Sequence, residues 1–542
     1  MNNHAILRLW AILRTDVVLR LRRTSTLLLI ALVCLLAYSI IPDPASGRGL
    51  IVINGARSLY NTAAISFATS MIFALIGIGL FGFYMVSNTI RRDTDSRVGN
   101  VIAATPVQSW EYIVGKFLGN SAFLALITVV YGAAMMIMYA IRAEAPFELL
   151  IFFRTYLQFC FSPIIFVSVT ALVFESLPVL SGRIGDVAYF FLWGLALALP
   201  SAQIDGILKH HNIGTGLNDV PLIAYCDVLG IGSGMASIKA QISQPMTNFS
   251  LGASPFNAAL PPRALTEVSI PMDWLIAKMI ASFVILSGLV IARLTFHRFD
   301  PTTARASARH SRRNIIALIN TALKPLSRLN LGIWELLGVA SYRVPFFRAV
   351  VAEILLLVTI KPITLIALVG VNLFALLLPF AVVKSVLLPI ASLVFVALCA
   401  DCALRERHSG ASALAFSMPD IKSGFVWIKF TAVWLLGVLF MGVALTRMIA
   451  VHPSSCISLI VSVVLLSAGA VGMGIAAGSP KAFMVSALLL FYVSLNSGAT
   501  TPALDFGGWY GTATSEVQIG YGLSALGLLG AGYLVHWWRA LR

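Results

Sequence analysis

Two polar stretches of the sequence repeat the same residue types at the same spacing. Each begins with an arginine and an acid, continues through a proline and an aromatic residue, and ends with a lysine. The first contains Arg92, Asp93, Pro106, Tyr112 and Lys116, and the second contains Arg405, Glu406, Pro419, Phe425 and Lys429. Corresponding residues lie 313 positions apart without a gap. Complementary charges can steer and hold a partner surface, so both stretches, together with Arg97, are candidate docking sites.

Other kinds of chemistry have little support in the sequence. The Gly-rich residues 230–234 are not followed by the Gly-Lys of a phosphate loop, and no group of residues has metal-ligand spacing. We therefore expect no cofactor in this chain. Titratable side chains are scarce in the middle of the apolar segments, which argues against an ion-driven pump. Asn372 and Gln158 are candidates to line a pathway, and an interhelical hydrogen bond is the alternative role for Asn372.

The composition shows what kind of protein positions these residues. Of the 542 residues, 59% are hydrophobic and only 11% are charged, whereas soluble domains contain about 25% charged residues. A water-soluble enzyme and a disordered chain are both excluded. The six cysteines are scattered and imply no disulfide framework. The sequence therefore predicts an all-α polytopic membrane protein.

Apolar runs long enough to cross a bilayer predict about twelve transmembrane helices, six in each half of the chain. The runs are 24–41, 64–90, 117–141, 149–174, 187–199 and 274–294 in the first half, and 362–380, 385–404, 430–449, 454–477, 482–495 and 519–537 in the second. Alternate connecting segments hold about three times as many lysines and arginines as the others, which places both termini in the cytoplasm. The net charge of +16 is thus mainly a topology signal, and no nucleic-acid partner is expected.

The same plan recurs in residues 1–296 and 344–542, which predicts two pseudo-symmetric halves. Each half opens with a basic amphipathic stretch, 4–23 or 344–361, that is typical of a helix lying in the membrane interface and contacting lipid. Each polar stretch, 91–116 or 405–429, predicts a short helix, a kink at proline and a second helix. Residues 297–343 predict a cytoplasmic linker.

Two outside loops complete the plan, at 200–273 and 496–518. The longer loop, 200–273, predicts either a passive cap or a contact for a periplasmic or accessory partner.

The first polar stretch resembles the coupling-helix region of type-2 ABC transporter permeases. The resemblance lies in Arg92-Asp93, Ala104-Thr105-Pro106, Tyr112 and the Gly-Lys-Phe-Leu-Gly of residues 115–119. Residues 296–301, Phe-His-Arg-Phe-Asp-Pro, are similar to the exit of the sixth span in bacterial members with two fused halves. The second polar stretch departs from the pattern, with Ser417-Met418 before its proline and Ile428 before Lys429, so the register of the second coupling helix stays open.

The resemblance implies a permease in the bacterial inner membrane whose energy comes from a separate ATPase, which binds ATP and Mg²⁺. The duplicated stretches imply two copies of that ATPase. The expected function is outward movement of an amphiphilic or apolar cargo such as a peptide, antibiotic or lipid. The alternatives are a secondary transporter or lipid flippase that works alone, and a membrane scaffold that transports nothing. A membrane-anchored loop without a partner is the alternative interpretation of each polar stretch.

Overall fold

We analysed a computed structural model of the full chain. It describes residues 3–22, 40–177, 182–202, 222–242, 248–296, 345–360, 363–417, 419–499 and 501–540. A few isolated residues between these ranges, such as Phe299, are also described. The structure is mostly helical and divides into two compact units, Met1–Arg309 and His310–Arg542. The division falls within the predicted linker, which lies outside the described residues apart from Phe299.

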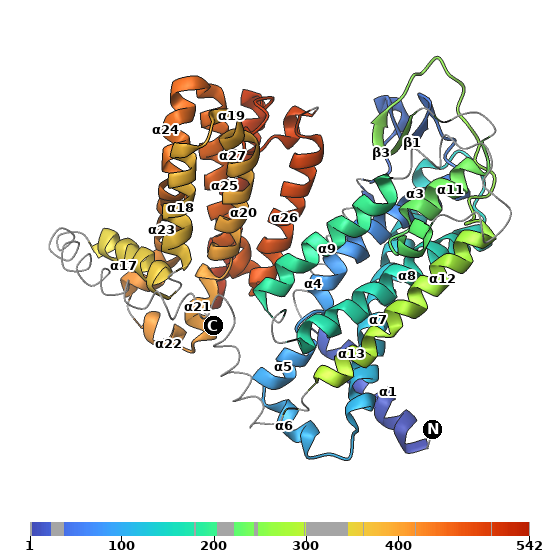
Figure 1. The fold of residues 1–542 in the computed structure, drawn as a ribbon, viewed down its shortest axis with the longest axis horizontal. Coiled ribbons are helices and arrows are strands. Elements are labelled where there is room, and N and C mark those ends of the chain that lie inside the picture. The colour runs from blue at the N-terminus through green and yellow to red at the C-terminus, as the bar shows by residue number, and fades with distance from the viewer. Residues whose placement is uncertain are drawn as a thin grey trace. The chain divides into compact units, whose positions relative to one another are not determined.

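Unit 1 is a bundle of long helices, shown in blue and green in Figure 1. Its helices are α1 (Asn3–Leu21), α3 (Thr62–Ile72), η2 (Phe73–Gly82), α4 (Phe83–Val86), α5 (Thr89–Asp95), α6 (Val98–Ala103), α7 (Ser109–Arg142), α8 (Leu149–Ser176), α9 (Arg183–Ala202), α11 (Ile231–Lys239), α12 (Met272–Leu286) and α13 (Gly288–Thr295), with short 3-10 turns η1 (Pro44–Ser46) and η4 (Leu222–Cys226). The predicted first span, 24–41, lies almost entirely outside the described residues. The stretch predicted as an interfacial helix, 4–23, is α1.

One end of unit 1 carries a small antiparallel sheet that the sequence did not predict. Its strand order is β2 (Ala56–Arg57), β1 (Arg48–Ile53), β3 (Phe249–Pro255), and the register pairs Ile53 with Phe249. The sheet joins the segment before α3 to the predicted outside loop 200–273. The short helices α5 and α6 lie at the opposite end of the bundle (Figure 1), because α3 to α5 run away from the sheet.

The second predicted span of each half contains a π-helical stretch. In unit 1 the helix from Thr62 to Thr94 includes η2, and in unit 2 the helix from Phe380 to Arg407 includes η6 (Val383–Leu387). A π-helix departs from the regular i to i+4 hydrogen bonding of an α-helix. Two aromatic side chains of α9 reach carbonyl groups of η2: the Tyr189 hydroxyl donates to Gly79, and the Trp193 indole donates to Leu75 over 2.8 Å.

Unit 2, shown in yellow to red in Figure 1, is the second bundle. Its helices are α17 (Pro345–Ile360), α18 (Ile363–Leu377), α19 (Phe380–Val382), η6, α20 (Leu388–Cys399), η7 (Cys402–Leu404), α21 (Arg405–His408), α22 (Ser412–Ala415), α23 (Pro419–Phe440), α24 (Gly442–Val451), α25 (Pro453–Ala477), α26 (Pro480–Ser497), η8 (Pro502–Leu504) and α27 (Ser515–Ala540). Glycines bring α25 and α27 together, because a Cβ on Gly472 would lie 2.1 Å from the Leu528 carbonyl oxygen.

The predicted span 430–449 is interrupted in the structure. Helix α23 begins earlier, at Pro419, and ends at Phe440, and α24 starts after Met441. Asn372 of α18 stabilises the break: its side-chain amide donates to the Leu439 carbonyl over 3.0 Å, and its oxygen accepts from the Val443 amide over 3.0 Å. The side chain thus pairs with backbone groups at the interruption.

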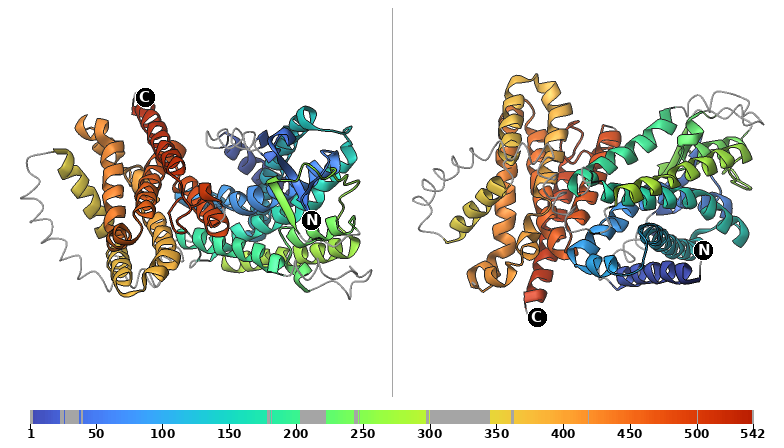
Figure 2. Two further views of the ribbon diagram at one scale, coloured as in Figure 1. Left: turned by 90° about the horizontal axis from the view of Figure 1, so that it is seen from above. Right: turned by 60° about the horizontal axis from the view of Figure 1, so that its bottom comes forward.

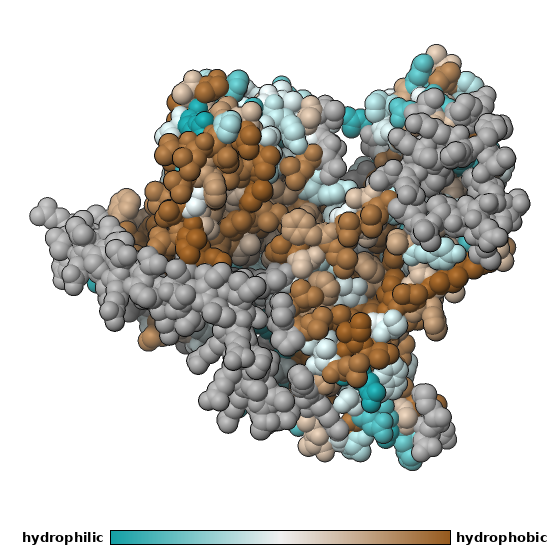
Figure 3. All heavy atoms as spheres, viewed as in Figure 1, coloured by the Kyte–Doolittle hydropathy of each residue, from teal (hydrophilic) through white to brown (hydrophobic). Residues whose placement is uncertain are grey.

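Among the described residues, eight helices are long and apolar enough to cross a membrane, with a ninth if the bent pair α17 and α18 is one span. Shorter apolar helices cover Gly185–Pro200, Gly442–Val451 and Pro480–Leu495. Apolar side chains gather over the middle of the helices, and polar ones lie nearer their ends (Figure 3). Exposed residues such as Phe283, Leu377 and Leu526 belong to this apolar surface. The chain is therefore a polytopic membrane protein.

Candidate functional site: a repeated cluster of buried ion pairs

Four charged side chains of unit 1 meet at the end of the bundle that carries α5 and α6. Asp16 of α1 contacts both cations, with Oδ1 2.7 Å from Arg92 Nη2 and 2.8 Å from Lys116 Nζ. Asp93 Oδ2 lies 2.7 Å from the same Lys116 nitrogen and accepts a hydrogen bond of 2.8 Å from the Tyr112 hydroxyl. The cluster therefore ties three elements together: α1, α5 and the first turns of α7.

Two glycines explain how α1 comes so close to α7. A Cβ on Gly115 would lie 2.9 Å from Ile12, and a Cβ on Gly119 would lie 3.1 Å from the Cβ of Asp16. The pair forms the small-xxx-small spacing that permits close helix packing. Helix α1, the dark blue helix beside the N label in the right-hand view of Figure 2, can therefore present Asp16 directly to Lys116.

Unit 2 contains an equivalent cluster, in which three of the four charged residues hold the corresponding sequence positions. Glu353 of α17 lies 2.8 Å from both Arg405 Nη2 and Lys429 Nζ, and Glu406 contacts Lys429 as well. Arg405, Glu406 and Lys429 are the residues 313 positions after Arg92, Asp93 and Lys116. Here α17 packs on α23 through Val350, Ile428 and Ala432 instead of through glycines.

The lysines of both clusters are buried, and the charges of each cluster balance. The side chains of Lys116 and Lys429 are 4% and 3% exposed, and each contacts two carboxylates. Each cluster holds two cations and two anions. A buried charge without a partner is strongly destabilising, whereas a fully paired set can be accommodated. These charges therefore fix the position of the short loop helices relative to the bundle.

An aromatic stack lies beside each cluster. The Tyr112 ring stacks on Phe296, just after α13, with ring centroids 5.1 Å apart, and the Phe425 ring stacks on His536 of α27 at 5.2 Å. Lys116 and Lys429 also lie over the Tyr112 and Phe425 rings, at 5.3 and 5.4 Å. The stacks thereby connect the end of α13 to the cluster of unit 1 and α27 to the cluster of unit 2.

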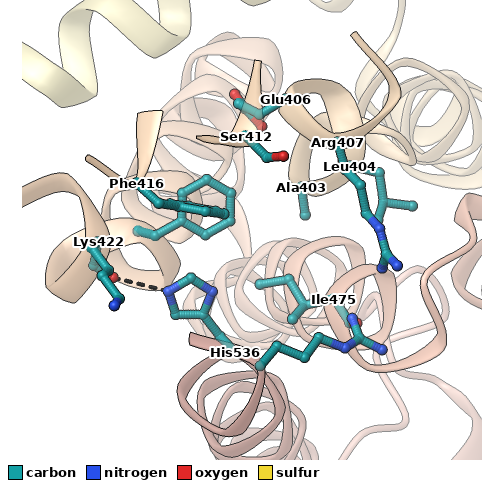
Figure 4. A pocket seen from close by; sticks show the side chains of 11 residues that line it. Ala403, Leu404, Glu406, Arg407, Ser412, Phe416, Lys422, Ile475 and His536 are labelled. Atoms are coloured by element: carbon teal, nitrogen blue, oxygen red, sulfur yellow. Dashed lines mark hydrogen bonds between the residues drawn. The ribbon is translucent and has the colours of Figure 1, made fainter. Parts of the chain in front are cut away.

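A cavity of about 440 Å³ lies beside the cluster of unit 2 (Figure 4). Residues from five parts of unit 2 line it, among them Arg407, Phe416, Lys422, His536 and Arg539. His536 hydrogen-bonds the Lys422 carbonyl through Nε2 over 2.9 Å. Arg539 donates to the Ile475 carbonyl over 2.6 Å at the end of α25. His536 and Arg539 thus link α27 to the backbones of α23 and α25.

The outer surfaces of the loops carry different residues from the clusters. Val98 and Val101 on α6 are 48% and 66% exposed, and Leu414 on α22 is 74% exposed. Arg97, which precedes α6 with a positive φ of 59°, and Pro106 are also exposed and lie outside the cluster. Pro419 begins α23, and its side chain lies outside the described part of the chain. Each polar stretch contains two short helices, α5 and α6 in unit 1 and α21 and α22 in unit 2. It ends within the first turns of a long helix, α7 or α23.

The structure thus brings together eight of the predicted site residues as two sets of four: Arg92, Asp93, Tyr112 and Lys116 in unit 1, and Arg405, Glu406, Phe425 and Lys429 in unit 2. Sequence reasoning missed the two acids that complete the sets. Asp16 is the only acid in residues 1–23 and Glu353 the only acid in 344–361, and a single acid in a basic apolar stretch could have signalled them. Asn372 lies at the α23–α24 break, and Gln158 lines a separate pocket on α8.

No family model matches this sequence, and neither a curated protein nor a solved structure matches it.

Proposed function

We propose that the chain is the membrane-spanning subunit of an ATP-driven exporter of the ABC type. In this proposal it resides in a bacterial cytoplasmic membrane, with both termini in the cytoplasm and twelve spans in two halves of six. Two copies of a separate ATPase dock on it from the cytoplasm. The cargo is amphiphilic or apolar and moves outward.

The repeated ion cluster is the observation that supports the proposal best. In each unit a buried acid from the first helix pairs with both an arginine of the loop and a lysine of the following long helix. A loop held in this way moves together with the helices to which it is paired. Force applied to the loop is therefore transmitted into the bundle, as a coupling element requires.

The exposed apolar residues indicate where the partner binds. Val101 and Leu414 project from the loop helices, while the charges of Arg92, Asp93, Arg405 and Glu406 are occupied within the chain. Interfaces bury apolar side chains at their centre and place charges at the rim. In the proposal the apolar side chains contact the ATPase, and the paired charges position them.

Co-expression and co-purification with phosphate-loop ATPases from the same genome test the proposal. We expect a complex with two ATPase copies, and we expect Val101→Asp with Leu414→Asp to weaken it at least about tenfold, since a buried apolar contact is lost. Leu260→Asp, at an exposed apolar site on the predicted outside loop 200–273, is the matched control for complex formation. Cargo movement by the chain alone in vesicles would contradict the proposal, as would a double variant that retains the full complex and its ATP turnover.

A further inference from the structure

The cavity of unit 2 shown in Figure 4 is lined by positive charges that the ion cluster beside it does not use. Arg407, Lys422 and Arg539 each contribute a cationic side chain to the lining. Glu406 is the only acid among the lining residues, and its carboxylate is paired with Lys429. The lining therefore has a net positive charge.

The two arginines come together at the end of α25. Arg539 donates to the carbonyl groups of Ile475 and Ala476, over 2.6 and 3.3 Å. A Cβ on Gly478, the residue that caps α25, would lie 3.5 Å from Arg407 Nη1. The two guanidinium groups repel each other, and Figure 4 shows both on the same side of the cavity. An anion bound between like charges lowers the cost of bringing them together.

The end of α25 accounts for only part of this charge. The C-terminus of a helix carries about half a negative charge, and Arg539 already occupies its carbonyl groups. The side chains of Arg407 and Lys422 form no ion pair or hydrogen bond within the described ranges of the chain. Both side chains are exposed, as is Arg539, so an anion from outside the protein can reach them.

Tryptophans indicate how deep in the membrane the cavity lies. Trp427 follows Lys422 by five residues on α23, and Trp537 and Trp538 directly precede Arg539 on α27. All three tryptophans are exposed. Tryptophan is enriched at the level of the lipid head groups, where its ring contacts both the apolar and the polar region. The cavity therefore lies at the depth at which lipids carry their phosphate groups.

The composition of the lining fits a phosphate group that is attached to a larger molecule. A guanidinium group pairs with phosphate oxygens through two parallel hydrogen bonds. The Ser412 hydroxyl lines the cavity as a further donor, and Leu404, Phe416 and Ile475 provide apolar walls. The volume of about 440 Å³ is within the usual range of small-molecule sites, so part of the attached molecule fits as well.

We infer that this cavity binds a phosphate monoester group, carried by a lipid head group or free in solution, which pairs with Arg407, Lys422 and Arg539. Such a group has about two negative charges at neutral pH, so it balances the three cations better than a singly charged phosphate diester does. The bound group would tie α21, α23 and α27 together at the end of α25. The inference goes beyond the proposed function, because the binding needs no ATPase and no cargo.

Native mass spectrometry of the purified full-length chain in detergent tests the inference. The probes are dioctanoyl phosphatidic acid, whose head group is a phosphate monoester, and dioctanoyl phosphatidylcholine, which has the same tails and no net charge. We expect phosphatidic acid to bind at least about tenfold more tightly, since one charge-assisted hydrogen bond contributes roughly that factor. Equal binding of both lipids would overturn the inference, because the site would then recognise only the tails.

Equilibrium dialysis of the chain with radiolabelled inorganic phosphate distinguishes the two sources of the group. Saturable binding of inorganic phosphate supports a site that recognises the phosphate alone. Selective binding of phosphatidic acid without binding of inorganic phosphate supports a site for the lipid head group, which also uses the apolar walls. Binding of neither probe overturns the inference.

Variants locate the binding in this cavity. Arg407→Gln with Lys422→Gln should abolish the preference for phosphatidic acid, and both side chains are exposed, so the fold should be retained. Arg14→Gln with Arg22→Gln removes two exposed cations of unit 1 and is the matched control for net charge. Ser412→Trp should weaken the binding of every probe, because it fills the cavity and leaves its charges in place. An unchanged preference in the Arg407 and Lys422 double variant overturns the inference, as does an equal loss in the control.

Discussion

The two ion clusters share their charges and differ in what surrounds them. In unit 1 the Tyr112 hydroxyl donates to Asp93, whereas the equivalent Phe425 has no hydroxyl to donate to Glu406. Each cluster also contains one carboxylate oxygen, Asp16 Oδ2 or Glu406 Oε2, that is buried without a hydrogen-bond partner among the described residues. The space beside the first cluster is filled by Phe299, which lies against Gly99, and the space beside the second is a cavity. The charge pairing is thus the repeated feature, while the packing around it differs between the units.

Loss of the bridging acid should have the largest effect on either unit. Asp16→Asn and Glu353→Gln each remove a carboxylate that contacts two buried cations, so we expect the free energy of unfolding to fall by about 3 kcal/mol in both cases. Denaturant unfolding in detergent measures the change. The exposed acids Asp43 and Glu516, changed to Asn and Gln, are matched controls. A large effect in only one unit would break the equivalence of the clusters.

Phe299 in unit 1 and Phe416 in unit 2 each contact the aromatic stack beside the ion cluster, and their removal should affect stability to different extents. Phe299→Ala leaves a hole beside Tyr112 and Phe296, at a cost of about 2 kcal/mol for this partly buried ring. Phe416→Ala should cost less, because the Phe416 ring already borders the 440 Å³ cavity. Thermal unfolding of both variants gives the comparison. Equal costs would mean that the cavity of unit 2 does not reduce the packing of Phe416.

Exchanging tyrosine and phenylalanine at positions 112 and 425 tests the contribution of one hydrogen bond to stability. Tyr112→Phe removes the donor to Asp93 and should lower the free energy of unfolding by about 1 kcal/mol. Phe425→Tyr, the reciprocal change, should be neutral or stabilising, since it offers a donor near Glu406. The two variants are each other's controls, because they exchange the same hydroxyl. A stabilised Tyr112→Phe would show that this bond contributes nothing to the first cluster.

The smallest effect is expected at the opposite end of unit 1, where Arg57 of β2 pairs with Glu144 over 2.7 Å. The hydrogen bond from Arg57 lowers the pKa of the Glu144 carboxyl from its usual value. A lowered pKa in the folded state stabilises the fold above the unfolded pKa of about 4.3, and this stabilisation is lost as the pH falls further. For a partly exposed pair the contribution is below about 1 kcal/mol.

Glu144→Gln should therefore match the parent chain at pH 3 and unfold slightly more easily at pH 7. Stability measured at both pH values checks the sign of the effect. A variant that is weaker at pH 3 than the parent chain would contradict the assignment of this ion pair, and Glu148→Gln, also near the start of α8, is the control.

The membrane character and much of the repeat could be predicted from the sequence alone. Long apolar runs must avoid water, so they predict helices wherever they occur, and α7, α8, α25 and α27 lie where such runs predicted them. The spacing of Arg92, Asp93 and Lys116 also anticipated the second set, because equal spacing in similar helices leads to equal placement. Docking of an ATPase on these stretches remains a prediction.

The pairing of the charges and the exposure of individual loop residues, in contrast, depend on the folded structure. Asp16 is 76 residues from Arg92, and no local pattern relates them. The strands β1 and β3 are likewise short and separated by about 200 residues, and the break at Met441 depends on Asn372 from another helix. These features arise from contacts between distant segments. The periodicity of a sequence predicts which face of a helix is apolar, but it does not predict which other helix packs on that face.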